Sequence, residues 1–312
     1  MSFKAVLEAI TLLDSPKACG QAVVDAVNTW GVGQVSFKTI YGEKGHTDFV
    51  KILIPGQRGK SQGGNAPTLG IIGRLGGVGA RPEAIGMVSD ADGAVTAVAA
   101  ALKLSQMAAL GDTLPGDVII CTHVCPNSPT LPHDPVPFMG APVDMATMNR
   151  HEVDREMDAI LSVDTTKGNR IINVRGFAIS PTVKEGYILR VSEDLLDIMS
   201  ITTGKPPVTF PVTIQDITPY GNGVYHLNSI LQPSTATDAP LVGVAITACS
   251  VVPGCATGAS HPTDIEEATR FVIEVAKAFG AGKCRFYDET EFETLVGLYG
   301  PMTHLRTMGR DS

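Results

Sequence analysis

The sequence predicts an α/β protein, a three-layer αβα sandwich with a mostly parallel mixed sheet. Short apolar runs that end in polar turns alternate with helical patterns over residues 68–280, as is typical of a parallel sheet with helices on both faces. The segment "PTDIEEATRFVIEVAKAFG" (262–280) begins with a capping signal and keeps an apolar stripe at helical spacing. A chain of 312 residues, 44% of them hydrophobic, can bury a large core.

The expected elements follow one another without a repeat or a linker, so we predict a single domain over residues 1–312. Residues 1–66 are expected to form helices at 3–13 and 16–29 and an extended hairpin with the turn "YGEKGHTD". The expected strands are "TLGIIG" (68–73), "GDVIICTHV" (116–124), "DAILSVDTT" (158–166), "RIINVRGFAIS" (170–180), "PVTFPVTIQDI" (207–217) and "LVGVAITACSVV" (241–252). The remaining helices are expected at 93–110, near 192–199 and at 262–280.

The composition excludes several classes of partner. The net charge is −8 and there is no basic run, so nucleic acid is not an expected partner. No apolar run reaches the roughly 18 residues of a membrane span, and the N-terminus has the pattern of an amphipathic helix rather than of a signal peptide. Six cysteines in such a chain are expected to be free thiols. We therefore expect a cytoplasmic protein.

The chain also carries signs of interaction surfaces. It is rich in glycine and alanine, with surplus apolar surface, so we expect a homo-oligomer. The proline-rich loop 126–142, "PNSPTLPHDPVPFMGAP", is long enough to be either a lid or an interface arm.

Polar side chains with useful chemistry follow the expected strands in several separate segments of the chain. They are Arg74, Asp90, Asp92, His123, Cys125, Asp164 and His261. The carboxyl ends of parallel strands meet at one edge of a sheet, where ligands gather. Zinc takes carboxylate and imidazole ligands from several segments, so Asp90, Asp164 and His261 are candidate metal ligands.

Each of these residues also has a simpler interpretation. Asp90 and Asp92 can cap the helix that follows them, and Asp164 can cap its own turn. His261 precedes a helix start, where it can be a flanking residue. Cys125 can be a small buried residue, or part of a structural zinc site in "CTHVC", whose spacing is a weak signal.

The order of several motifs resembles that of the zinc-dependent exopeptidases of the aminopeptidase superfamily, which have one αβα domain. "IGMVSDADGAVTAVAAALKL" (85–104) is similar to their Gly-Ala-x-Asp-x-x-x-Gly turn and the helix after it. "AILSVDTTKG" (159–168) is similar to their strand that ends in a ligand Asp, and "GASHPTDIEEATRFV" (258–272) to the segment with their last ligand His. At closer range the chain resembles an uncharacterised prokaryotic family, domain of unknown function 1177, which implies no activity.

The chain departs from the exopeptidase pattern at two places. Where those enzymes have His-x-Asp it has Arg74-Leu75-Gly76, and where they have Glu-Glu it has His123-Val124-Cys125. The resemblance then implies that the Arg74 guanidinium takes the charge position of one metal and pairs with the carboxylate of Asp164.

The second metal position keeps Asp90 and His261, and either His123 or Cys125 is its third ligand. Three protein ligands and an open position are the arrangement of a catalytic zinc. Asp92 or His123 would accept the proton of the attacking water.

These expectations favour a metal-dependent hydrolase of amide bonds in small peptides or related compounds, with zinc or another divalent metal. Its metal ligands would be Asp90, Asp164, His261 and Cys125, and its catalytic residues Asp92, His123 and Arg74. One alternative is a metal-independent racemase that uses Cys125 and Cys255 with lowered pKa values. Another is a non-catalytic protein that binds a peptide or a small molecule in the cleft that corresponds to the exopeptidase active site.

Overall fold

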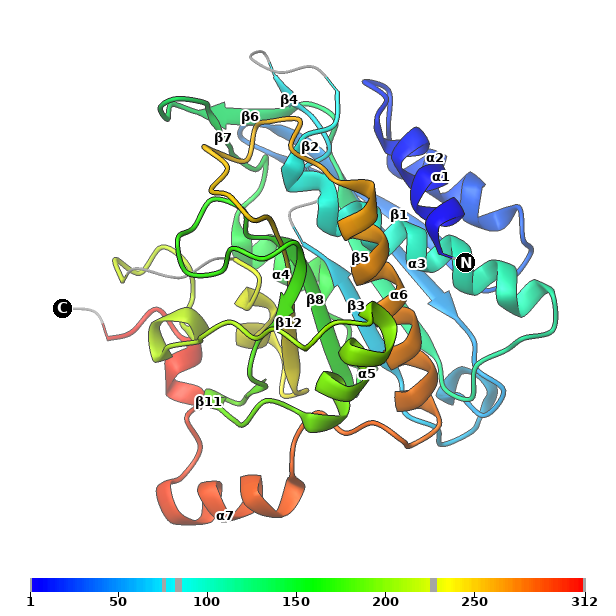
Figure 1. The fold of residues 1–312 in the computed structure, drawn as a ribbon, viewed down its shortest axis with the longest axis vertical. Coiled ribbons are helices and arrows are strands. Elements are labelled where there is room, and N and C mark those ends of the chain that lie inside the picture. Colours follow the sequence, from blue (N-terminus) through cyan, green and yellow to red (C-terminus); the bar gives the residue numbers. More distant parts are fainter. Residues whose placement is uncertain (1, 75–76, 82–85, 225–228, 311–312) are drawn as a thin grey trace.

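The computed structural model describes residues 2–74, 77–81, 86–224 and 229–310. Within these residues the centre of the molecule is a nine-stranded sheet in the order β1-β2-β5-β3-β8-β12-β10-β11, with β9 paired to β12 (Figure 1). Its strands are β1 (Gln34–Gly42), β2 (Gly45–Ile54), β3 (Leu69–Gly73), β5 (Val118–Val124), β8 (Ala159–Thr165), β9 (Gly176–Ile179), β10 (Val183–Lys184), β11 (Tyr187–Ile188) and β12 (Leu241–Thr247). Neighbours among β5, β3, β8 and β12 are parallel, so their carboxyl ends lie at one edge.

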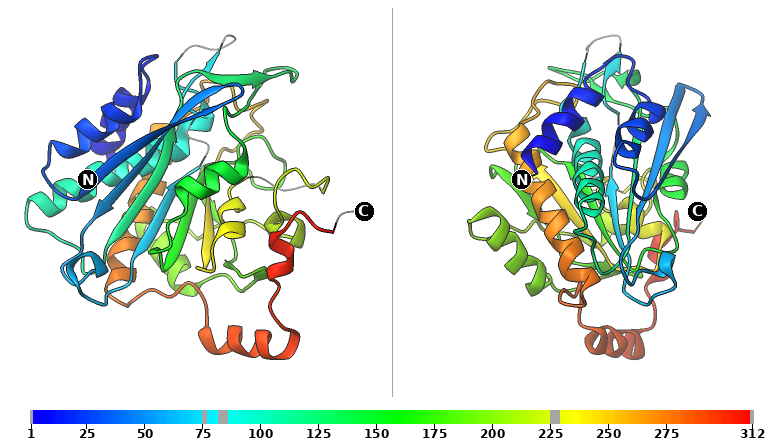
Figure 2. Two further views of the ribbon diagram at one scale, coloured as in Figure 1. Left: turned by 180° about the vertical axis from the view of Figure 1, so that it is seen from behind. Right: turned by 90° about the vertical axis from the view of Figure 1, so that its right-hand side faces the viewer.

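Helices cover both faces of this sheet, which confirms the predicted αβα sandwich (Figure 2). The larger core lies under the helices α1 (Phe3–Leu13), α2 (Gly20–Asn28), α3 (Asp92–Ala109), α5 (Glu193–Thr203) and α6 (Pro262–Gly280). A smaller core lies on the other face, where α4 (Met145–Glu152) packs on β2 and β5. Ile71 belongs to the larger core and Ile72 to the smaller one, because successive residues of a strand point to opposite faces.

The helix α3 lies unusually close to the sheet. A Cβ atom on Gly93 would lie 2.5 Å from the carbonyl oxygen of Val163 and 2.7 Å from that of Arg74. Only glycine allows this approach, because any other residue would place a side chain there. The first turn of α3, with Asp92, therefore lies directly against the ends of β3 and β8.

Three predicted strands are wrong or too long, and the one expected over 241–252 is a strand only at Leu241–Thr247. The segment 207–217 forms no strand of the sheet, only one bridge between Thr209 and Ile179 and a 3₁₀ turn at Ile214–Ile217. Its two prolines lack the N–H group that a central strand must donate. The expected strand over 170–180 is a strand only at Gly176–Ile179.

A small second sheet lies at the carboxyl edge, where Figure 1 shows it above the main one. It consists of β4 (Ala80–Arg81), β6 (Ser128–Leu131) and β7 (Phe138–Met139). The proline-rich loop 126–142 is therefore partly built of strands. The C-terminal helix α7 (Glu289–Tyr299) was not expected. No helix in the described ranges has the length and apolar character to cross a bilayer.

Candidate functional site

Three acidic side chains meet at the carboxyl edge of the sheet. Asp164 is near the end of β8, Asp90 lies in the 3₁₀ turn before α3, and Asp92 is the first residue of α3. Only 7% of Asp90, 1% of Asp164 and none of Asp92 is exposed to solvent. Burial, with the neighbouring charges of Asp164 and Asp92, raises the pKa of Asp90 well above its ordinary value. The structure thus brings these three predicted residues together.

Asp92 is held by two other segments. Its carboxylate accepts hydrogen bonds from the buried ammonium of Lys167 and from Ser260 Oγ, the latter at 2.6 Å. Lys167 also donates to the carbonyl oxygen of Ala259 at 2.7 Å. Burial raises the pKa of Asp92, although Lys167 and Ser260 act in the opposite direction. Both carboxylate oxygens are occupied, which limits Asp92 as the general base that the sequence suggested.

Asp164 and Asp90 differ in their partners. Asp164 accepts hydrogen bonds from Ser229 Oγ at 2.8 Å and from the Thr165 backbone N–H at 2.7 Å. Burial raises the pKa of Asp164 to about 6, against the lowering effect of these bonds. The Asp90 carboxyl has no hydrogen bond or ion pair with any described residue. A buried carboxyl without such a partner needs a proton or a bound cation.

Arg74 and His123 meet at a residue that sequence reasoning missed, Glu152. Arg74 Nη1 donates to Glu152 Oε2 at 2.5 Å and to Asn149 Oδ1 at 3.2 Å, and its other terminal nitrogen contacts the sulfur of Met145. The Nδ1 atom of His123 lies 2.7 Å from Glu152 Oε1. Arg74 and Glu152 are fully buried, and His123 is 2% exposed.

This geometry corrects the expected pairing of Arg74 with Asp164, because the ion pair is with Glu152. The guanidinium acts on Asp164 only through its charge, which lowers the pKa of that acid. Burial opposes ionisation of Glu152, but the Arg74 charge and the His123 bond outweigh it and lower its pKa. Ionised Glu152 can only accept hydrogen bonds, so it fixes the His123 tautomer with the proton on Nδ1.

The lowered pKa of Glu152 predicts a pH dependence of stability. Because the folded-state value lies below the ordinary 4.5, ionised Glu152 stabilises the fold above that pH, and the contribution is lost as the pH falls through the lowered value. We expect the difference in free energy of unfolding between wild type and Glu152→Gln to be constant from about pH 8 to about pH 5, then to shrink. Denaturant unfolding at several pH values measures it, and a difference that grows on acidification would contradict this assignment.

The two remaining predicted residues, Cys125 and His261, have different surroundings. Cys125 Sγ donates to the carbonyl oxygen of His46 at 3.4 Å. His261 is the exposed N-cap residue of α6, and its charge lowers the pKa of Asp92. In the part of the chain that the structure describes, no three His, Cys, Asp or Glu side chains are arranged to hold a metal ion. The zinc ligand set stays a prediction, and Leu75 and Gly76 lie outside the described residues.

The thiols are unsuited to the racemase alternative as they lie. Burial raises the pKa of the Cys125 thiol. Burial, followed by the charge of Asp90, raises the pKa of the Cys255 thiol to about 12. Proton exchange at a substrate carbon needs thiols with lowered pKa values, so both shifts are in the wrong direction.

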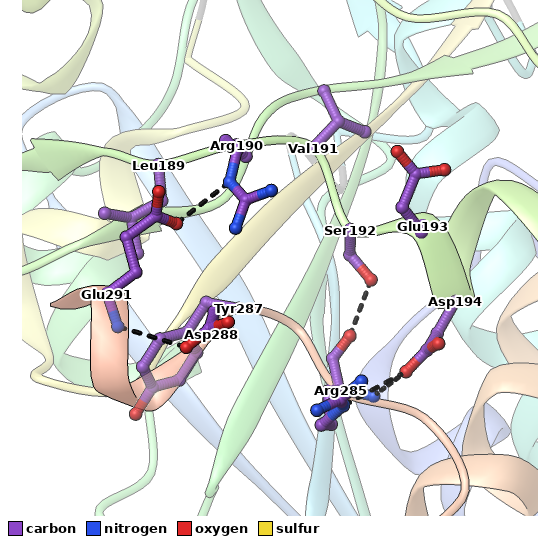
Figure 3. Close-up of a pocket in the computed structure, with 10 residues that line it drawn as sticks. All are labelled: Leu189, Arg190, Val191, Ser192, Glu193, Asp194, Arg285, Tyr287, Asp288 and Glu291. Atoms are coloured by element: carbon purple, nitrogen blue, oxygen red, sulfur yellow. Dashed lines mark hydrogen bonds and ion pairs between the residues drawn. The ribbon is translucent and has the colours of Figure 1, made fainter.

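A separate cavity of about 230 Å³ lies between the starts of α5 and α7 (Figure 3). Its two arginines are paired, Arg190 with Glu291 at 2.9 Å and Arg285 with Asp194 at 3.7 Å. None of the three central acids lines it. Both arginines of this cavity are therefore paired, unlike Asp90 at the carboxyl edge of the sheet.

Comparison with known proteins gives one structural likeness and one family match. The fold is distantly similar to "The crystal structure of Legionella pneumophila LapA aminopeptidase", with a TM-score of 0.49 and 9% sequence identity, over 91% of this chain and 70% of that one. No curated protein matches. The family model described as "Protein of unknown function (DUF1177)" matches residues 38–309. The chain therefore belongs to this family.

Proposed function

We propose that this protein is a hydrolase of amide bonds in small peptides or related compounds, dependent on a divalent cation held by Asp90 and Asp164. The observation that carries the proposal is the Asp90 carboxyl, which is 7% exposed, lies beside two other acids and has no partner among the described side chains. A carboxyl group in this setting is costly unless something positive binds it.

The charge balance of the buried residues supports a divalent ion. Asp90, Asp92, Asp164 and Glu152 are four buried acids, and they face two buried basic side chains, Arg74 and Lys167. Arg74 forms an ion pair with Glu152, and Lys167 forms one with Asp92. Two negative charges therefore remain when all four acids are ionised, and they belong to Asp90 and Asp164. One divalent cation, or two protons, balances them.

The donor atoms favour a hard cation. Asp90 and Asp164 offer carboxylate oxygens, which suit Mg²⁺ or Mn²⁺ with water or substrate in the other positions. Zinc would need further nitrogen or sulfur ligands. Two such side chains are His261, whose charge lowers the pKa of Asp92, and Cys255, whose thiol pKa is raised by the charge of Asp90. The two carboxylates fit a divalent ion, and the choice between these metals is a question for titration.

The residues of the chain have complementary parts in this proposal. A bound divalent cation supplies Lewis-acid polarisation of an amide carbonyl and a more acidic water. Ser229 and the Thr165 N–H orient Asp164. The Arg74 charge lowers the pKa of Asp164 and so offsets part of the rise that burial causes. His123 is the proposed proton acceptor through Nε2, because its Nδ1 is engaged by Glu152.

The class of reaction rests on the ordered resemblance of the three motifs around Asp90, Asp164 and His261 to those of zinc-dependent exopeptidases. Small substrates are proposed because the acids are so deeply buried. Non-catalytic binding of a peptide is the second candidate, since this chain lacks the His-x-Asp and Glu-Glu residues of the exopeptidases.

Chelator-treated protein titrated with Mg²⁺, Mn²⁺ and Zn²⁺ tests the proposal. We expect about one equivalent of divalent cation to bind per chain, and hydrolysis of dipeptides or cyclic amides to depend on it. The exposed-acid variant Asp112→Asn is the matched control and should bind the cation normally. Absence of binding at millimolar metal, or turnover insensitive to chelator, would overturn the metal dependence. Binding of a dipeptide without turnover would favour the binding protein.

A further inference from the structure

The acids of the proposed site are closed off from solvent. Asp92 is fully buried, Asp164 is 1% exposed and Asp90 is 7% exposed. An amide bond must approach these side chains to within contact distance to react. Some covering segment therefore has to move before a substrate can enter.

The proline-rich segment Pro126–Pro142, which we call the flap, covers the loop beside the acids. The backbone N–H of Met139 donates to Cys255 Sγ at 3.0 Å, and its side chain packs on Val88 and Ala256. Val88 precedes Asp90 by two residues. Ser89, the residue before Asp90, donates hydrogen bonds from its Oγ to the carbonyl oxygen of Cys255 at 3.1 Å and from its N–H to that of Thr257 at 2.7 Å, so the covered loop lies beside the site.

The flap is attached more weakly than the strands beneath it. In the described part of the chain, its contact with the covered loop consists of one N–H···S bond, the Met139 side chain and a close approach of Val136 to Gly254. Two of its large apolar side chains, Leu131 and Phe138, are 44% and 42% exposed. By contrast, β5 is buried along its whole length and pairs with β2 and β3 over most of that length, whereas β6 of the flap pairs with each of its neighbours, β4 and β7, over two residues only. Segments with few buried contacts open at low free-energy cost.

We propose that the flap is the gate of the site: it closes over the Asp90–Asp164 pair and opens, by release of Met139 from Cys255, Val88 and Ala256, to admit a small amide. The admission of an amide substrate rests on the proposed function, but the opening of the flap can be measured without any activity. It assigns the proline-rich segment to a lid rather than to an interface arm.

The first test follows the labelling of Cys255 by a maleimide in the native protein, with peptide mass spectrometry to separate it from the exposed Cys249. We expect slow labelling of Cys255 in the wild type and labelling about tenfold faster in Met139→Ala, because the apolar contact that holds the flap is lost. Leu131→Ala is the matched control, since it changes an exposed side chain of the same flap, and it should label at the wild-type rate. Equal rates for Met139→Ala and wild type would overturn the gate.

The second test locks the flap. In Met139→Cys, the new thiol can form a disulfide with Cys255, whose sulfur already lies 3.0 Å from the backbone nitrogen of residue 139. We expect the oxidised form to bind cation or turn over substrate at least about tenfold more slowly than the same protein after reduction, whereas Met139→Ser is indifferent to oxidation. Unchanged rates in the locked protein would overturn the gate. If the wild type binds no cation and turns over no amide, the proposed function fails, and the labelling rates alone decide whether the flap opens.

Discussion

Replacement of Glu152 by alanine is expected to destabilise the fold by about 3–5 kcal/mol, because removing one partner of a buried ion pair leaves the other charge uncompensated. Glu152 and Arg74 are both fully buried, and Glu152 is the acidic partner of both Arg74 and His123. Its loss leaves a guanidinium that still contacts Asn149 but faces no carboxylate of a described residue at hydrogen-bond distance. Denaturant unfolding of the cation-free protein measures the change.

A paired variant separates the loss of the charge pair from the loss of packing. Arg74→Met combined with Glu152→Leu removes both charges and keeps most of the volume, so we expect it to recover much of the stability that Glu152→Ala loses. The double variant should still impair any activity, because His123 loses the carboxylate that orients it. If the double variant is as unstable as the sum of its single variants, the two residues are not coupled and the ion pair does not explain their burial.

The sequence allowed prediction of the elements that are long and regular. The helix at 262–280 and the Ala-rich helix after Asp92 have clear start signals and strong patterns, and the structure has them at Pro262–Gly280 and Asp92–Ala109. The place of Asp164 at the carboxyl edge also follows from a rule of parallel sheets, since it lies at the end of an apolar strand, and Asp90 approaches it from the turn before α3. Local pattern and fold class were enough for these features.

The residues that complete the site depend on contacts far apart in the sequence. Glu152 ends α4, a short helix over Met145–Glu152 that lacks an apolar stripe and so gave no periodic signal. Its one local sign is the N-cap of Asp144, which accepts a hydrogen bond from the Thr147 N–H at 2.7 Å. The bond to Arg74 spans 78 positions of the chain. No pattern in the sequence identifies such a partner, and it decides that Arg74 does not pair with Asp164.

The partners of Asp90 and Asp92 likewise could not be predicted from the sequence. The sequence predicts a metal ligand at Asp90 and a general base at Asp92, with a helix cap as the simpler interpretation of both. The structure separates them, because Lys167 and Ser260 occupy Asp92 while Asp90 is left without a partner among the described residues. Lys167 belongs to the turn sequence "DTTKG", where a charged side chain is typically exposed to solvent, yet it is 2% exposed. The distribution of buried charge, which carries the functional proposal, is a property of the folded chain alone.

Replacement of Asp90 by asparagine is expected to weaken divalent-cation binding by at least about a hundredfold, with a similar loss of any cation-dependent hydrolysis, because even outer-shell partners of a metal ligand are worth about 10–100-fold. The amide has nearly the same shape as the carboxyl but no charge, so the packing around residue 90 is kept. Calorimetric titration and the amide-hydrolysis assay measure the two losses, and Asp112→Asn, which changes an exposed acid, should show neither.

The stability of Asp90→Asn gives an independent check on the same residue. Burial and the charges of Asp164 and Asp92 make ionised Asp90 unfavourable in the cation-free fold, and this cost is absent for a neutral amide. The cation-free variant should therefore unfold at a higher denaturant concentration than wild type above neutral pH, whereas saturating cation should stabilise only the wild type. A variant that is less stable than wild type without cation, yet still stabilised by it, would show that Asp90 is a structural residue and that the cation binds elsewhere.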